Sequence, residues 1–294
     1  MSVFVSQNSQ ECHFSTSESW VILSSIEQSI KRKIETVGKP LKDWDINIYR
    51  GILTGYNEAF IIDGKKKDEL IAQDAKSAEI IRPILRGRDI KRYSCDFAEK
   101  YVICARLSSN IPVNYPVISH YLESFKGKGK LGDNSTTKVF NRPWWCWMQE
   151  PINYWDDFNM QKIMYPNMTK FLPFYLDDKN FLQNDKSFMI TGNNLYFLTA
   201  FLNSSLFKFC FIDNFPELQG GTRELRKIFL NKIPVIDVSP EKNLVFKPLV
   251  EKCQRLAICN LNTVETAKEI DDIIFNLYKL TDEEKAAVGF IEIL

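Results

Sequence analysis

Histidine is scarce in this chain, with only His13 and His120 among 294 residues. His13 falls in a polar N-terminal stretch, and His120 stands beside Tyr121 in a predicted helix, where a surface or half-buried role is more common than that of a base. Because histidine is the side chain most often used for proton transfer, the sequence offers little for hydrolytic catalysis. Neither a GxSxG nor an HExxH pattern occurs.

Paired cysteines are also missing. The seven cysteines include no CxxC pair, and their count is odd. A disulfide framework or a zinc site would need such pairs, so we expect scattered reduced thiols of the kind found in cytosolic proteins. The cysteines stand at positions 12, 95, 104, 146, 210, 253 and 259. The predicted location is cytoplasmic.

Long hydrophobic runs are absent as well. The most apolar stretch, residues 195–212, is interrupted by polar residues such as Asn203, Ser204 and Lys208 and is too short to span a bilayer. We interpret it as one buried helix capped by Asn193. The N-terminal residues are polar and do not resemble a signal peptide, so no membrane partner is expected.

Motifs that bind cofactors or metals are missing too. There is no GxGxxG followed in context by a helix, no P-loop, and no Asn/Asp-Pro-Pro-aromatic sequence for gripping a flipped base. The acidic pairs Asp156–Asp157 and Asp177–Asp178 are more typical of turns than of a metal clamp. The chain is therefore predicted to bind a partner rather than to catalyse, with no catalytic residue, metal site or cofactor of its own.

What is present is an alternation of strand-like and helical spacing. Strands are predicted at 46–48, 59–62, 101–104, 162–165 and 171–176, with a tight hairpin turn at 51–57, a charged, exposed helix or loop at 65–74 and a short helix at 116–125. A capping box from Ser15 to Glu18 precedes apolar residues at helical spacing up to Val37. The predicted fold class is α+β, a mixed β-sheet domain with flanking N-terminal and C-terminal helices.

Pro234 to Pro240 marks the clearest boundary. Beyond it, residues 249–277 keep helical spacing, and Thr281 with Glu284 forms a second capping box before a short last helix. We therefore divide the chain into an N-terminal tail with a support helix (1–40), a central domain (41–236) and a C-terminal helical segment (237–294).

Charge is unevenly distributed, although the net charge is only +1. Residues 82–142 carry twelve Lys and Arg against five Asp and Glu, a net of +7, whereas residues 237–294 carry seven against eleven, a net of −4. A local positive field of this kind attracts phosphates. A plain solvated face explains such an excess about equally often, so both interpretations stand.

Three segments suit contact with nucleic acid. Residues 49–60 place two glycines in a turn whose N–H groups could meet a phosphate, although a plain hairpin turn is the commoner explanation. Residues 81–93 hold closely spaced arginines, which fork onto phosphate or guanine, although Arg88 could equally form a structural ion pair with Asp89. Residues 141–147 hold three tryptophans, of which one or two would pack inside while another stacks outward.

The order of these motifs resembles the TaqI-like C-terminal specificity domain, the target-recognition part of adenine-N6 DNA methyltransferases and of fused type IIG restriction-methylation enzymes. The resemblance extends from about Ile48 to Val288 and implies a fragment of a larger enzyme or a separate specificity subunit. It rests on Gly-Ile-x-Thr-Gly-x-Asn-x-Ala-Phe from Gly51, Arg-Pro-Ile-Leu-Arg-Gly-Arg-Asp-Ile-Lys-Arg-Tyr from Arg82, Trp144-Trp145, Lys162-Ile163-x-x-Pro166, Leu198-x-x-x-Leu202-Asn203-Ser204, Lys232-Ile233-Pro234 and the tail from Ile270 to Glu284.

The resemblance implies a module that recognises a DNA sequence without activity of its own. It would position double-stranded DNA for an adenine-N6 methyltransferase or endonuclease in another domain or subunit, and S-adenosylmethionine and Mg²⁺ are expected only there. Residues 41–236 would be the target-recognition domain, and the helices at 20–37 and 249–280 would pack as an antiparallel support. The residues expected at the DNA are Arg50, Thr54, Asn57, Arg86, Arg88, Lys91, Arg92, Lys126, Lys128, Lys130, Arg142, Trp144, Asn167, Thr169, Lys170, Thr222 and Arg223.

Base-reading side chains differ among such proteins, so we expect them in two polar and aromatic segments, 133–147 and 167–170, with 218–226 as a second candidate loop. Two other functions stay open. One is a stand-alone nuclease or methyltransferase-associated enzyme with a divergent active site, which metal-dependent cleavage by the isolated chain would reveal. The other is a specificity subunit that only docks other proteins.

Overall fold

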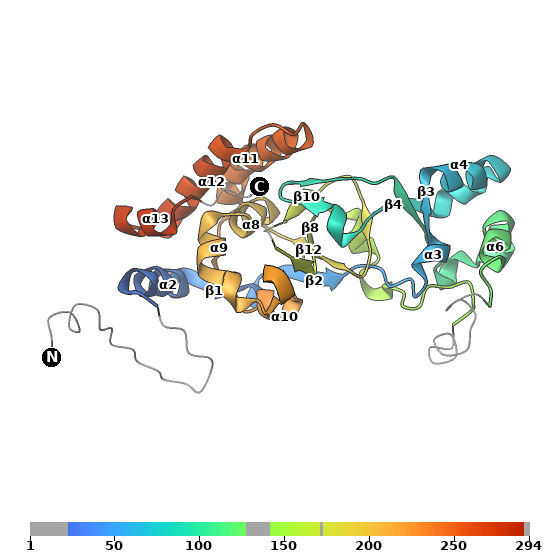
Figure 1. Cartoon of the computed structure of the whole chain (residues 1–294), viewed down its shortest axis with the longest axis horizontal. Helices are drawn as coiled ribbons and strands as arrows, with labels where there is room; N and C mark the ends of the chain where they lie inside the picture. The colour runs from blue at the N-terminus through green and yellow to red at the C-terminus, as the bar shows by residue number, and fades with distance from the viewer. Residues whose placement is uncertain (1–22, 128–141, 171–172, 291–294) are drawn as a thin grey trace.

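The computed structural model describes residues 23–127, 142–170 and 173–290. Helices gather at both ends of an elongated molecule, and the two larger sheets lie between them (Figure 1). Strands and helices are interspersed along the chain, and the sheets contain both antiparallel and parallel pairs. The α+β class predicted from the sequence is confirmed.

The first sheet has four strands in the order β10-β8-β12-β2, and each neighbouring pair is antiparallel. Its strands are β2 (Ile46–Arg50), β8 (Lys162–Pro166), β10 (Tyr175–Asp177) and β12 (Ser187–Gly192). Every residue of β8 is buried, as a short continuous apolar run predicts. The strand expected at 162–165 is confirmed. Of the strand expected at 171–176, residues 171–172 lie outside the described residues, and β10 starts at Tyr175.

The second sheet is mixed and has the order β11-β4-β7-β3, with β11 parallel to β4. Its strands are β3 (Ile61–Asp63), β4 (Ile81–Leu85), β7 (Lys100–Ile103) and β11 (Leu182–Gln183). Beside it lie α3 (Asn57–Phe60), α4 (Gly64–Gln73), α5 (Ile111–Asn114) and α6 (Pro116–Glu123). The helix expected near 116–125 and the strand at 101–104 are therefore confirmed, and the segment 65–74, expected as a helix or a loop, is a helix.

The hairpin predicted around residues 51–57 is wrong. Strand β2 pairs with β12, whereas β3 pairs with β7, so the two strands belong to different sheets. The segment between them is a crossing from one sheet to the other, and residues 57–60 form the short helix α3. A glycine-rich turn signal gives the place of the turn but not the partner of each strand.

Three smaller sheets complete the β-structure. The largest of them is antiparallel with the order β13-β14-β9, from β9 (Met168–Thr169), β13 (Glu217–Leu218) and β14 (Thr222–Glu224). The other two pair β1 (Gly38–Pro40) with β15 (Pro234–Ile236), and β5 (Ile90–Lys91) with β6 (Ser94–Cys95). Helix α10 (Lys227–Leu230) follows β14 along the chain.

The single buried helix expected at 195–212 is two helices, α8 (Leu195–Leu202) and α9 (Ser205–Phe211), so that expectation is corrected. Asn203 causes the break: its amide accepts from Phe174 N at 3.2 Å and donates to Phe174 O at 2.8 Å. Ser204 then caps α9 through a bond from Phe207 N. Asn194, not Asn193, stands at the cap of α8, with φ 56°.

The C-terminal segment forms α11 (Pro240–Ile258), α12 (Val264–Leu277) and α13 (Asp282–Val288). The capping box predicted at Thr281 and Glu284 is confirmed. Helix α2 (Ser25–Val37) begins later than predicted because Ser24 and Glu27 form its capping box. The box expected at residues 15–18 lies outside the described residues.

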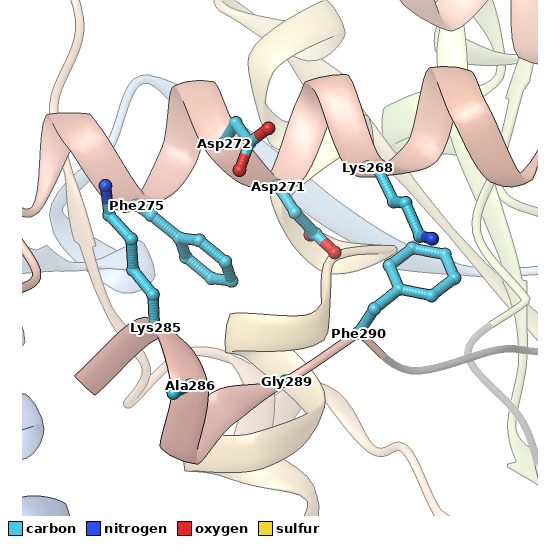
Figure 2. Close-up of a pocket in the computed structure, with 8 residues that line it drawn as sticks. All are labelled: Lys268, Asp271, Asp272, Phe275, Lys285, Ala286, Gly289 and Phe290. Atoms are coloured by element: carbon cyan, nitrogen blue, oxygen red, sulfur yellow. The ribbon is translucent and has the colours of Figure 1, made fainter. Parts of the chain in front are cut away.

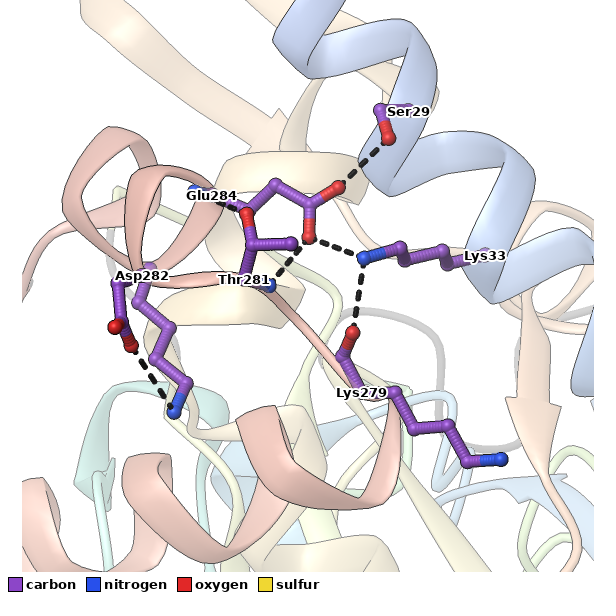
Figure 3. Close-up of polar contacts among 7 residues, drawn as sticks. Ser29, Lys33, Lys279, Thr281, Asp282 and Glu284 are labelled. Atoms are coloured by element: carbon purple, nitrogen blue, oxygen red, sulfur yellow. Dashed lines mark hydrogen bonds and ion pairs between the residues drawn. The ribbon is translucent and has the colours of Figure 1, made fainter.

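Helix α2 is tied to the end of the chain (Figure 3). The Glu284 carboxylate accepts from Ser29 Oγ at 2.7 Å and pairs with Lys33 Nζ, which also donates to Lys279 O. The expected support between the two end segments is therefore made through α13 and Lys279, two residues before its cap, with α2 also packed on β15.

One apolar core joins the first sheet to the helices and includes Ile34, Ile190, Phe201, Phe246 and Ile274. Because this core crosses residues 40 and 236, the proposed divisions there do not separate independent cores. The second sheet has a core of its own. Among the described helices none alone has the length and apolarity to cross a membrane. One pair that passes together, Leu195–Leu202 and Ser205–Asn214, is bent by 64°.

Candidate nucleic-acid interface

The arginine-rich segment turns sharply after β4. Asp89 accepts bonds from Arg86 Nε at 2.8 Å, from Arg86 Nη2 at 2.7 Å and from the Arg86 backbone N–H at 2.8 Å. These bonds raise the pKa of Arg86 above its ordinary value. The structural ion pair that the sequence suggested for Asp89 exists, but its partner is Arg86, not Arg88.

Arg92 also points away from solvent. Its Nη2 donates to Asn203 O at 2.8 Å, its guanidinium lies 5.3 Å from the centre of the Tyr93 ring, and its Nε is buried without a partner. Arg86 and Arg92, both expected at the DNA, are therefore engaged in bonds within the chain. Arg88 is exposed and makes no ion pair within the described residues, and Lys91 is exposed with Asp96 3.6 Å away.

The turn after β2 is held together by its own polar residues. Thr54 is buried, and its hydroxyl donates to Asn57 Oδ1 at 2.6 Å, while Asn57 itself is exposed. Gly51 is required here, because a Cβ would stand 2.1 Å from Asn184 O. Thr54 therefore shapes the turn rather than facing a phosphate, and Asn57 is its accessible polar group.

The tryptophan segment divides as the sequence predicted. Trp145 and Trp147 are buried, whereas Trp144 is partly exposed with Lys126 Nζ 5.0 Å from its ring centre. Arg142 pairs with Glu150 at 3.3 Å, so its guanidinium serves the fold. Lys128 and Lys130 lie outside the described residues.

Glu150 anchors this segment. It accepts from Arg106 Nε at 2.8 Å and from Leu107 N at 3.0 Å, in addition to Arg142. Burial by itself raises the pKa of Glu150, but these hydrogen bonds and the positive charge of Arg106 outweigh burial and hold the pKa below its ordinary value. The carboxylate is a structural anion at neutral pH.

The small sheet β13-β14-β9 unites two segments that the sequence treated separately. Thr169 lies opposite Arg223 in the register, and residue 224 lies opposite Met168. Arg223 donates to Phe215 O and pairs with Asp213 at 3.0 Å and Glu217 at 2.8 Å, so it braces the sheet. Of the candidates here, Lys170 is exposed, while Asn167, Thr169 and Thr222 are half-buried.

Arg50, Arg88 and Lys186 stand on segments that come together where both larger sheets end, and we call these residues the junction cations. Asp185 binds Arg50 Nη2 and Lys186 Nζ, each at 3.2 Å. A Cβ on Gly87, next to Arg88, would stand 2.6 Å from Lys186 O. The same carbonyl accepts from Asn167 N at 2.9 Å, which brings the small sheet to this edge.

Lys186 was not among the residues expected at the DNA. It stands in a short turn between β11 and β12 with no motif around it, and only the pairing of strands places it beside residues 87 and 167. A positive residue between two buried strands was the single signal available.

A hollow of about 350 Å³ lies between α12 and α13, in the helical tail (Figure 2). Its lining residues are Lys268, Asp271, Asp272, Phe275, Lys285, Ala286, Gly289 and Phe290. Asp271 is already engaged, since Ser205 donates to it through N at 2.9 Å and Oγ at 2.5 Å, and burial raises the pKa of this carboxyl.

The acidic pairs of the sequence do not converge on one site. Asp177 is fully buried against Lys162 Nζ at 2.6 Å, and Asp157 accepts from Thr191 Oγ1 at 2.6 Å. Within the described ranges no group of three or more His, Cys, Asp or Glu side chains is placed to hold a metal ion.

Comparison with known proteins finds one family model and one related sequence. The family model described as the TaqI-like C-terminal specificity domain matches residues 82–235. The type II methyltransferase M.MjaIV of Methanocaldococcus jannaschii is 24% identical over 197 residues, which cover 62% of this chain and 61% of that protein.

Two solved structures share the fold. The type IIG restriction endonuclease BpuSI matches with a TM-score of 0.52 at 14% identity, over 87% of this chain and 33% of that one. The type IIL restriction-modification enzyme MmeI, in complex with DNA, matches with a TM-score of 0.59 at 11% identity, over 85% of this chain and 35% of that one. The chain thus spans less than two thirds of the length of each relative.

Proposed function

The chain belongs to the family of the TaqI-like C-terminal specificity domain, and from this premise we propose that it binds double-stranded DNA at a specific sequence. The supporting observation is the edge at which the junction cations and the sheet β13-β14-β9 meet. Cations that lie beside an exposed β-ribbon provide phosphate contacts and base contacts on one surface, which is the combination that sequence recognition needs.

The proposed interface is smaller than the sequence analysis expected. Its phosphate-binding groups are Arg88, Lys186 and Lys170, which are all exposed. Arg50, whose side chain is 50% exposed, is a fourth. Lys91, Lys126 and Asn57 are exposed and remain candidates, as does the half-buried ring of Trp144. Arg86, Arg92, Arg142 and Arg223 instead position these residues through their bonds to Asp89, Asn203, Glu150 and Glu217.

The second part of the proposal concerns chemistry. We propose that this chain positions DNA for an adenine-N6 methyltransferase or endonuclease carried by another domain or subunit. S-adenosylmethionine and Mg²⁺ would bind there, and a buried carboxylate of this chain such as Asp177 already has a structural partner in Lys162. The greater length of the relatives supports a partner of this kind.

A selection experiment tests the proposal. The full chain is incubated with a random duplex pool, bound DNA is sequenced, and affinity for the selected duplex is measured at several salt concentrations. We expect one enriched sequence and an affinity that falls steeply with salt. Binding without sequence preference, or no binding, would contradict the proposal. Cleavage or methylation by the chain alone, after addition of Mg²⁺ or S-adenosylmethionine, would contradict its second part.

A further inference from the structure

The sheet β13-β14-β9 has two different faces. Directly paired residues of an antiparallel sheet point to the same side, and neighbours along a strand point to opposite sides. The register therefore puts Thr169, Arg223 and Glu217 on one side, where Arg223 and Glu217 are ion-paired. On the other side, which we call the outer face, lie Met168, Leu218, Thr222 and Glu224.

The outer face exposes apolar side chains where a structural role would bury them. Met168 is 53% exposed and Leu218 is 40% exposed, and each is the apolar residue of its own two-residue strand. Thr222 and Glu224 separate them, so they do not form the continuous apolar patch of a protein interface. An apolar group flanked by polar groups matches the edge of a base pair, which carries a thymine methyl beside donors and acceptors.

Charge around the outer face favours DNA as the occupant. Lys170 directly follows β9 and its Nζ stands 3.9 Å from the position that a Cβ of Gly220 would take. Arg226 pairs with Glu224 at 2.7 Å and covers the acid of this face. Lys186 is joined to the sheet through the bond from Asn167 N. Cations thus border the face on several sides.

The turn between β13 and β14 leaves room for another molecule to approach closely. Gly220 and Gly221 connect β13 to β14 with φ values of 74° and 76°, which other residues adopt only with strain. Nothing lies within 4 Å of the position of a Cβ on Gly221, so the tip is open. The hairpin β13-β14 that carries this turn is a two-stranded antiparallel ribbon, a form that the major groove of B-form DNA admits.

We propose that the outer face enters the major groove and that Met168 and Leu218 contact the 5-methyl groups of thymines in the recognised sequence. This inference rests on the proposed function. The two side chains belong to the outer strands of the three-stranded sheet, about 10 Å apart across the strands and, because Met168 lies opposite Glu224 and Leu218 opposite Thr222, about 7 Å apart along them, which makes about 12 Å in all. At about 3.4 Å for each base pair, they would contact two thymines about three to four steps apart.

The test removes single methyl groups from the DNA. Each thymine of the duplex selected by the full chain is replaced in turn by deoxyuridine, which lacks only the methyl. For the wild-type chain we expect a loss of affinity of about four-fold at one or two positions, the factor that corresponds to one buried methyl-sized group. In M168A or L218A the same replacement should cause no further loss, because the contact is already gone.

Two exposed residues elsewhere provide matched controls. Met160 is 55% exposed and precedes β8, whereas Asn167 follows the other end of that strand. Leu107 is 56% exposed and lies beside the second sheet. M160A and L107A should keep the wild-type pattern of deoxyuridine sensitivity. All four variants should keep the wild-type unfolding temperature, since each side chain is exposed.

The outcomes separate the inference from the proposed function. If the wild-type chain selects a sequence but M168A and L218A show the full wild-type sensitivity to every deoxyuridine, the outer face does not read thymine and the inference is wrong. If these variants instead lose binding to a methyltransferase partner, the face is a protein interface, which also overturns it. If no sequence is selected, the proposed function itself fails.

Discussion

The arginine-rich segment 82–92 and the sheet β13-β14-β9 make opposite use of their polar residues. In the first, two of the closely spaced arginines bind other parts of the chain: Arg86 pairs with Asp89, and Arg92 donates to Asn203 O. In the second, few cations are present, yet apolar side chains stay exposed and Lys170 is free of ion pairs in the described structure. The density of charge along a sequence therefore does not locate the surface that is available to a partner.

The difference has a local cause. Asp89 follows Arg86 by three residues in a tight turn, so the pair forms within one segment at little entropic cost. The small sheet has Arg223 as its brace on one side only, and no element within the described structure covers the exposed side chains of Met168 and Leu218.

The largest effect on stability is expected from breaking the ion pair between Arg86 and Asp89. D89A leaves the mostly buried Arg86 guanidinium without its carboxylate and removes the cap of the turn. We expect the free energy of unfolding to fall by about 3 kcal/mol, measured by urea denaturation. R88A, next to it, is the control and should change this energy by less than about 0.5 kcal/mol. If D89A were as stable as the wild type, the pair would not be structural, and Arg86 would again be a candidate for DNA binding.

A pH series on E150Q extends the comparison to a second group of arginines held by a carboxylate, namely Arg106 and Arg142 around Glu150. Because the folded pKa of Glu150 is below its ordinary value of 4.5, its stabilisation is fully present above that value and is lost as the pH falls through the lower folded pKa. We expect E150Q to be less stable than wild type by about 2 kcal/mol at pH 7. The gap should shrink as the medium becomes more acidic than pH 4.5. A gap independent of pH would contradict the assigned role of the charge.

Removal of the exposed junction cations should act on DNA binding alone. R88A and K186A are each expected to reduce the slope of log affinity against log salt concentration by about 1, with unfolding unchanged. Binding is followed by fluorescence anisotropy of a labelled duplex. K252A removes an exposed lysine of helix α11 and is the control. Equal slopes for R88A and K252A would show that Arg88 lies away from the DNA.

The smallest effect is expected at Lys126. Its ammonium lies over the exposed side of the tryptophan segment, 5.0 Å from the Trp144 ring. K126A should lower the free energy of unfolding by only about 0.5 kcal/mol and leave sequence preference intact. Both are measured as above. A loss of preference would instead place Trp144 and Lys126 among the residues that read bases.

Much of the fold followed from local patterns, and the exceptions depended on distant contacts. The second capping box at Thr281 and the buried strand at 162–165 were predicted, because their signals lie within a few residues. The break at Asn203 was missed, because it depends on Phe174, 29 residues away. The false hairpin had the same origin, since β2 and β3 find their partners far along the chain.

The candidate site was predictable in its segments but not in its side chains. The sequence indicated 167–170 and 218–226, which the structure joins in one sheet. It could not separate Arg88 from Arg86, because both precede the same aspartate by at most three residues. Met168 and Leu218 carried no signal, since their exposure is decided by strand register.

The bonds from Ser29 and Lys33 to Glu284 have a consequence for how the protein is made. The partners are separated by 255 and 251 residues, nearly the length of the chain. During synthesis helix α2 must wait until α13 has left the ribosome before this contact can form. Contacts between such distant residues slow folding, so α2 gains its partners β15 and α13 late in the folding of the chain.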